Sequence, residues 1–272
     1  MQQEPLYLHC IKKKEYHCLI KIKCASYFLH ANIDGMKEKK LINTFEEDVS
    51  EVNQDYSKRV VVHETKSTWH TSPCKGVERI YLERNNLGEK ATATSIVRFS
   101  ANSYFEEHTH DSGEEFLVLD GIFADEYGSY PKGTYIRNPD GTNHNPYSKD
   151  GCTIFVKLRQ FRSNDTKHVV KDTVNLTWQP GLIPGLSVMP LHEFDDEHTA
   201  LVKWEPNTQF EPHKHWGGEE ILVLEGVFYD EYGVYPKGSW IRSPHLSQHS
   251  PFTKEEGAVI FVKTGNLKPN FD

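Results

Sequence analysis

The 272-residue chain is poor in the features that mark several classes of protein. It has 31 Lys and Arg against 39 Asp and Glu, which gives a net charge of −8 and a pI of about 6.0. A nucleic-acid-binding surface needs clustered basic residues, so no nucleic-acid partner is expected. No stretch of the sequence approaches the ~18 consecutive apolar residues of a membrane-spanning helix, so no membrane partner is expected either.

Cysteine is also scarce. There are five cysteines, an odd number, and three of them, Cys10, Cys18 and Cys24, lie within the first 35 residues. The other two, Cys74 and Cys152, have no counterpart in the internal repeat described below. A disulfide framework is therefore not expected, and this pattern favours a reducing, cytoplasmic location.

The N-terminal segment differs from the rest of the chain. Its first 35 residues are rich in Lys, Cys and His, the spacing of which fits no familiar zinc pattern, and lysines interrupt the apolar run that a signal sequence needs. We expect residues 1–57 to be a poorly ordered extension. Met36 is a candidate start of the protein, an idea that an intact mass including residues 1–35, measured from the native host, would contradict.

The rest of the chain contains a long internal repeat. The segment "HTHDSGEEFLVLDG" at 108–121 recurs as "HKHWGGEEILVLEG" at 213–226, an offset of 213 − 108 = 105 residues. The same offset relates Gly113 to Gly218 and His144 to His249 without a gap, and more than half of the residues in this span are identical. Solenoid repeats have periods of roughly 20 to 50 residues, so this repeat is a duplicated domain. The polar segment 162–168 separates the copies, and we expect domains at 58–164 and 165–266, with a tail at 267–272.

Each copy has the composition of an all-β domain. Short runs such as "TATSIVRF" and "CTIFVKLRQF" are rich in Val, Ile, Phe and Thr and are separated by Gly, Pro, Asn and Asp. Long helical periodicity is absent. Many short strands at regular spacing predict a sandwich or a barrel, with a jelly roll among the compact options.

The repeated segment holds candidate metal ligands. His108 and His110 are separated by one residue and would share one face of an extended strand. The next three residues permit a turn, after which Glu114 can bring its carboxylate to the same point. His144 is the candidate third imidazole, because its counterpart His249 keeps the offset. Three imidazoles and one carboxylate suit Zn, Fe(II), Mn, Ni or Cu.

A single pair of histidines on a solvated strand edge would be weak evidence for a metal. Here the four ligand types recur while neighbouring positions vary: Thr109 becomes Lys214 and Asp111 becomes Trp216. We therefore predict two divalent metal ions per chain, Zn first, with Fe(II) or Mn as alternatives. The predicted ligands are His108, His110, Glu114 and His144 in the first copy and His213, His215, Glu219 and His249 in the second.

These motifs resemble a known family. The pattern HxH, three residues, Glu, six residues, Gly, followed by "GSYPKGTYIRNP" or "GVYPKGSWIRSP" and a further His, resembles the cupins, and more narrowly the cupin domain of the ChrR type, over roughly residues 58–265. The resemblance implies two tandem double-stranded β-helix (jelly-roll) domains, a bicupin, and implies the same eight metal ligands. ChrR-type anti-sigma factors also carry an N-terminal zinc-binding helical domain with an HxxxCxxC pattern. That pattern is absent here, so binding of a sigma factor is not expected.

Other repeated residues have structural interpretations. We predict that Asp125 pairs with Arg137, and Asp230 with Arg242, in an ion pair that closes a hairpin beside each site. Glu115 follows the ligand Glu114 in sequence and should point to the opposite face, which favours a supporting or surface role over ligation. The same holds for Glu220.

Whether the protein is an enzyme is left open by the sequence. A closed zinc site would make it a binding or sensing module, the function that we place first, and the ChrR resemblance implies a role in an oxidative-stress response. Open coordination positions would instead suit a metal-dependent dioxygenase acting on a small carbonyl or diketone compound. A storage-protein or sugar-binding bicupin is the third hypothesis. A small molecule is the expected partner, and two fused copies are compatible with a homo-oligomer.

Overall fold

The computed structural model describes residues 51–267. The predicted start at Met36 and most of the predicted extension lie outside these residues. Within 51–57, Val52 exchanges two backbone hydrogen bonds of 2.9 Å with Arg84. The described part contains no helix long and apolar enough to cross a membrane.

The all-β prediction is confirmed for both copies of the repeat. The only helices among residues 51–267 are two three-residue 3-10 turns, Glu64–Lys66 and Gly88–Lys90. The strands that precede the linker are β1 Val60–His63, β2 His70–Thr71, β3 Val77–Arg84, β4 Ala93–Phe99, β5 Ser103–Tyr104, β6 His108–Thr109, β7 Glu114–Asp125, β8 Gly128–Pro131, β9 Thr134–Asn138, β10 Asn143–His144, β11 Tyr147–Ser148 and β12 Cys152–Leu158. Those that follow it are β13 Val169–Asp172, β14 Gln179–Pro180, β15 Leu186–Phe194, β16 Glu197–Trp204, β17 His213–Lys214, β18 Glu219–Asp230, β19 Gly233–Pro236, β20 Ser239–Ser243, β21 Gln248–His249 and β22 Ala258–Thr264.

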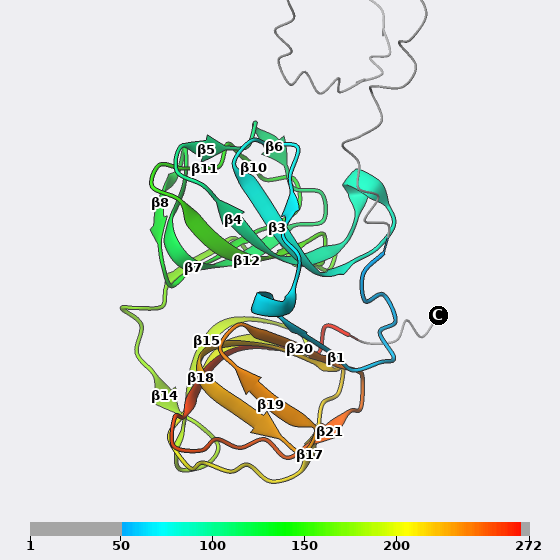
Figure 1. Ribbon diagram of the computed structural model, residues 1–272, viewed down its shortest axis with the longest axis vertical. Helices are drawn as coiled ribbons and strands as arrows, with labels where there is room; N and C mark the ends of the chain where they lie inside the picture. The colour runs from blue at the N-terminus through cyan, green and yellow to red at the C-terminus, as the bar shows by residue number, and fades with distance from the viewer. Residues whose placement is uncertain (1–50, 268–272) are drawn as a thin grey trace, which may run out of the picture. The chain divides into compact units, whose positions relative to one another are not determined.

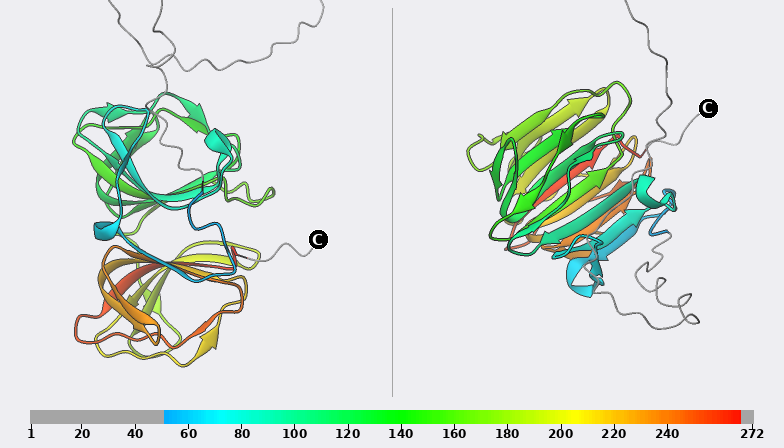
Figure 2. Two further views of the ribbon diagram at one scale, coloured as in Figure 1. Left: turned by 45° about the vertical axis from the view of Figure 1, so that its right-hand side comes forward. Right: turned by 90° about the horizontal axis from the view of Figure 1, so that it is seen from above.

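Each repeat forms a double-stranded β-helix in which all strand pairs are antiparallel, and its strands curve around their own interior (Figure 2). The main sheet of the first repeat has the order β13-β9-β7-β12-β4-β3-β2. That of the second has the order β1-β20-β18-β22-β16-β15-β14. Two small ladders, β6 with β10 and β17 with β21, complete the open ends.

The repeats exchange their first strands. β1 belongs to the first repeat in sequence but lies along β20 of the second, with Val60 opposite Arg242 (Figure 1). β13 returns the exchange and lies along β9, with Val169 opposite Arg137. A residue range therefore does not contain every strand of a sheet, and each sheet is completed by the other repeat.

Strand alternation separates two apolar environments. Phe116 and Val118 point into the first repeat's own interior, whereas Leu117 joins a core that both repeats supply, together with Trp240 and Phe261. The period is interrupted once in β7, where the register against β12 shifts between Val118 and Asp120. A β-bulge of this kind reverses the facing of later residues, and a matching shift occurs in β18.

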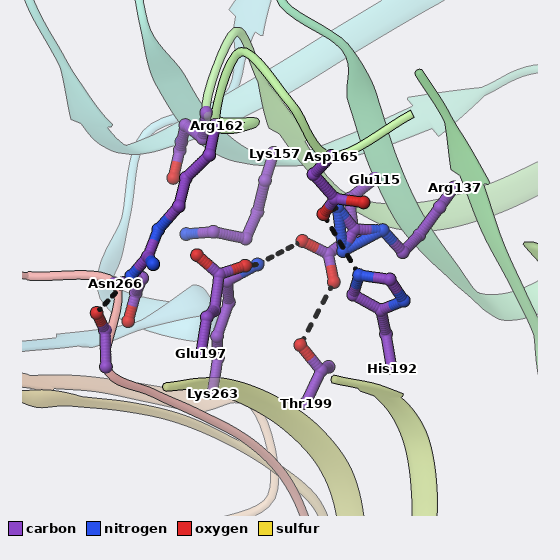
Figure 3. A network of polar contacts seen from close by, with 12 residues as sticks. Glu115, Arg137, Lys157, Arg162, Asp165, His192, Glu197, Thr199, Lys263 and Asn266 are labelled. Carbon is purple, nitrogen blue, oxygen red and sulfur yellow. Dashed lines mark hydrogen bonds and ion pairs between the residues drawn. The ribbon is translucent and has the colours of Figure 1, made fainter. Parts of the chain in front are cut away.

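The shared core contains buried charges (Figure 3). Lys263 Nζ lies 2.6 Å from a carboxylate oxygen of Glu115 and 2.6 Å from one of Glu197. In the other half, Lys157 Nζ lies 2.6 Å from Glu220 Oε1. The two glutamates that follow the predicted ligands thus point to the opposite face as predicted. That opposite face is buried between the repeats, so the prediction of a surface role for Glu115 and Glu220 is wrong.

The predicted ion pairs beside the sites are wrong. Arg137 pairs with Asp165 at 2.6 Å, and Arg242 with Glu83 at 2.6 Å. Arg137 lies opposite Glu115 in the β7 and β9 ladder and shares its face. Because the bulge in β7 intervenes, Asp125 points to the other side, toward the first repeat's interior.

Candidate metal centres

The first centre lies at the open end of the first repeat. His108 and His144 are direct partners in the β6 and β10 ladder, and the backbone N–H of His110 donates to Thr142 O at 2.8 Å. Ser112 and Gly113 have φ of 55° and 79°, so the chain turns sharply before Glu114 opens β7. One ligand atom from each of the four predicted residues lies within 4.8 Å of the others.

The imidazoles of the first centre are held from their outer nitrogens. His108 Nδ1 lies 2.9 Å from Glu106 O, and His144 Nδ1 lies 3.2 Å from Asp125 Oδ2. His110 Nδ1 lies 2.9 Å from Thr142 Oγ1, which already donates its own proton to Pro139 O. Each Nδ1 therefore carries the hydrogen and donates it, which leaves each Nε2 as a lone pair.

The inner nitrogens fit a metal ion. His110 Nε2 and His144 Nε2 are buried and have no hydrogen-bond partner. Burial of an unpaired polar atom is costly, and a cation between these nitrogens would remove that cost. Burial also lowers the pKa of His110 to about 4. This imidazole is neutral at pH 7, the state that coordinates a metal.

The second centre repeats the arrangement with one difference. His213 and His249 are partners in the β17 and β21 ladder, and their ligand nitrogens lie within 4.8 Å of each other and of that of His215. Glu219 does not belong to this mutual group. Its carboxylate oxygens lie 3.4 Å from His215 Nε2 and 3.5 Å from His249 Nε2.

Several features of the second centre also fit a cation. His215 Nε2 and His249 Nε2 face each other at 3.0 Å, and Glu219 Oε2 is buried without a hydrogen-bond partner. Burial lowers the pKa of His215 to about 3, so it is neutral at pH 7. Two ring nitrogens, which share one hydrogen bond, and a carboxylate oxygen therefore lie close together.

An apolar cavity of about 190 Å³ adjoins the second centre. Its wall includes His213, His215, Glu219 and His249, the four predicted ligand residues of this repeat. The remaining lining residues are almost all hydrophobic: Leu186, Val202, Trp204, Phe210, Phe228, Pro251, Ile260, Val262 and Thr264. A cavity of this size admits a molecule about as large as benzene, which binds in an apolar cavity of about 150 Å³.

Sequence reasoning missed the residues that support the ligands. Asp125 and Asp230 recur at the repeat offset, which was a usable signal, but they were assigned to arginines. Thr142 accepts from His110, whereas the hydroxyl of its counterpart Ser247 has no hydrogen-bond partner, so the repeat marks the position but not the contact. Arg59 bonds to Asp230 across 171 residues, and no local pattern marks it.

A family model of the ChrR cupin-like domain matches residues 57–162 and again 166–268. The chain belongs to the ChrR cupin-like family. No curated protein matches the sequence.

Several solved structures are similar to this chain in fold. A "putative dioxygenase" from Nostoc punctiforme is similar with a TM-score of 0.65 and 13% identity, over 79% of this chain and 85% of that one. Protein Ylba from Escherichia coli gives 0.61 and 17%, over 87% and 100%. The bacterial pirin YhhW from Escherichia coli, in complex with nickel(II), gives 0.54 and 12%, over 76% and 99%. At these identities the likeness concerns the cupin fold alone.

Proposed function

We propose that the protein binds one divalent metal ion in each repeat and that the second centre acts on a small, largely apolar molecule. The cavity beside His213, His215 and His249 is the observation that carries this proposal. Glu219 approaches His215 and His249 but stands outside the mutual group of the three imidazoles, which favours an open coordination position. Catalytic metal sites keep such a position, whereas structural sites are closed by four protein ligands.

The ligand for the second centre follows from the cavity wall. No Lys or Arg lines it, so beyond the metal ion itself a phosphate or a dicarboxylate would find no partner charge there. Trp204, Phe210 and Phe228 favour a hydrophobic body. A bound metal would polarise an oxygen atom of the substrate and offer a position for dioxygen. A small carbonyl or diketone compound meets these requirements, and a dioxygenase is the enzyme class. The description of the Nostoc protein agrees with it.

A sensing role is favoured for the first centre by a different observation. Its four ligand atoms all lie within 4.8 Å of one another, which suits closed tetrahedral zinc. Oxidation of such a site would release the metal, in keeping with a role in an oxidative-stress response. Loss of zinc from the first centre on exposure to singlet oxygen or an organic peroxide is expected; retention would argue against sensing.

Metal content tests the proposal. Protein purified without chelators or affinity metals should contain about two metal ions per chain by plasma mass spectrometry. Zn is the first expectation for the closed centre, and Fe(II) or Mn are the alternatives that would support catalysis at the open one. Oxygen uptake by the Fe(II)-loaded protein with β-diketones then tests the activity. Absence of uptake, with both metals bound, would leave a binding module and contradict the dioxygenase. The cytoplasmic location, the homo-oligomer and the absence of nucleic-acid, membrane and sigma-factor partners remain predictions.

A further inference from the structure

Arg59 reaches the second centre from the exchanged strand. It immediately precedes β1, which belongs in sequence to the first repeat but completes the second repeat's sheet. Arg59 Nη2 donates to Asp230 Oδ2 at 2.6 Å and to the hydroxyl of Tyr235 at 2.8 Å. Arg59 Nη1 donates to Ser243 Oγ at 3.0 Å. The main interaction of Asp230 Oδ2 is therefore the charged hydrogen bond from Arg59.

That oxygen is the one that also faces a metal ligand. Asp230 Oδ2 lies 3.6 Å from His249 Nδ1, beyond a normal hydrogen bond. In the first repeat, Asp125 Oδ2 lies 3.2 Å from His144 Nδ1. The other oxygen of Asp230 accepts from two backbone N–H groups and from Tyr235, as Asp125 Oδ1 accepts from the matching groups. The two aspartates thus differ mainly in the presence of the arginine.

The first repeat has no equivalent of this arginine. The residue before β13 is His168, in the register that Arg59 occupies before β1, since Val60 lies opposite Arg242 and Val169 opposite Arg137. His168 is exposed. Among the described residues, Asp125 forms its ion pair with His144 alone.

The charge of Arg59 and its hydrogen bond to Asp230 both lower the affinity of the second centre for a metal ion. A carboxylate that accepts the Nδ1 hydrogen of a ligating histidine makes the imidazole a better donor to the metal, and loss of such a partner typically weakens binding 10- to 100-fold. Arg59 competes for that carboxylate and neutralises its charge. It also places a positive charge near the cation, which opposes binding.

We propose that Arg59 is a positioning residue that weakens metal binding at the second centre relative to the first. The inference rests on the proposed metal binding. The exchanged strand thereby gives two centres with the same ligand types different affinities for the same ion. The closed first centre would fill first and the second would fill only at higher free metal.

The experiment is a competitive titration of the full-length, metal-free protein with Zn²⁺ against a chromophoric chelator. H215A leaves the first centre to be measured and H110A leaves the second. We expect the second centre to bind Zn²⁺ about tenfold more weakly than the first. R59Q in the H110A background should tighten the second centre severalfold, whereas R59Q in the H215A background should leave the first unchanged.

Two further variants distinguish a specific effect of R59Q on metal binding from a folding defect. S243A removes one contact of Arg59 without touching Asp230 and should leave the affinity of the second centre close to its starting value. H168R in the H215A background places an arginine in the matching position of the first repeat and should weaken that centre. Unchanged or weaker binding at the second centre in folded R59Q would overturn the inference, as would an unchanged first centre in H168R if R59Q does not fold. Absence of Zn²⁺ binding at both wild-type centres would instead contradict the proposed function.

Discussion

The two repeats carry the same four candidate ligands, three histidines and one glutamate, but surround them differently. Around the first centre, Asp111 and Asp140 stand where the second has Trp216 and His245, whose rings lie 4.6 Å apart. Leu158 at the end of β12 corresponds to Thr264, which lines the cavity of the second centre. The two repeats therefore share their candidate ligands and differ in the residues that surround these ligands.

The shared core shows the same divergence. In one half, Glu83 accepts from Arg242 and from Thr94. The position of Glu83 in the other half is His192, and the carboxylate comes from Asp165 of the linker, 3.0 Å from His192 Nε2. Buried arginine is thus paired in both halves, but by carboxylates from different parts of the chain. Pairing of the charge is the requirement, because an unpaired buried charge is destabilising.

Removal of one inner imidazole should have the largest effect on the comparison. H110A and H215A each delete an inner Nε2 from one group, so each should reduce the metal content by one ion per chain. Plasma mass spectrometry of the two variants and of the double variant measures this. Loss of both ions from either single variant would show that the centres are not independent. H198A, at an exposed histidine outside both groups, is the control and should retain both ions.

Truncation of the interface lysines should come next. K263M and K157M each leave a buried carboxylate unpaired, which costs about 3–5 kcal/mol in the free energy of unfolding. Lys263 contacts two carboxylates at 2.6 Å, whereas Lys157 has one at 2.6 Å and another at 3.8 Å, so K263M should be the more damaging. Urea unfolding of the metal-free variants tests the order. Adding E115Q to K263M should recover part of the loss, and a further loss would contradict the pairing.

Acid should weaken the same interface. Burial alone would raise the pKa of Glu115, but Lys263 and Arg137 outweigh it and lower the pKa to about 2. A group whose pKa is lower in the folded state contributes stability above its unfolded pKa, ordinarily near 4.5. That contribution should be lost as the pH falls from about 4.5 to about 2. The free energy of unfolding of metal-free E115Q should depend less steeply on pH in this window than that of the wild type. E78Q, at a partly exposed glutamate, is the matched control, and equal slopes for all three proteins would contradict the assignment.

The smallest expected effect concerns two residues at matching positions, Thr142 beside His110 and Ser247 beside His215. T142V removes the acceptor of the His110 Nδ1 hydrogen and should weaken Zn²⁺ binding at the first centre about tenfold. Ser247 occupies the matching position, but its Oγ has no hydrogen-bond partner, so S247A should leave the second centre unchanged. Chelator competition in the single-centre backgrounds measures both. Equal losses in the two variants would mean that the centres share the same supporting contact.

The repeat made much of the candidate site predictable. HxH and the following glutamate are local patterns, and the strict offset of His144 and His249 pointed to candidate ligands that lie 30 residues beyond that glutamate. The partner of Asp125 could not be found in the same way. A single bulge in β7 changes the face on which it points, and bulges leave no reliable trace in the alternation of residues.

The sequence by itself determined the all-β fold, the duplication and the set of candidate ligands, because strand composition and repeated motifs act over short distances along the chain. The tertiary structure alone decided which strands pair and which charges meet. β1 and β13 cross to the opposite repeat, and this crossing brings Arg59 to Asp230. Pairing at the edge of a sheet is specified by the packing of both repeats at once, so residues far apart in the sequence set the differences between two centres with the same ligand types.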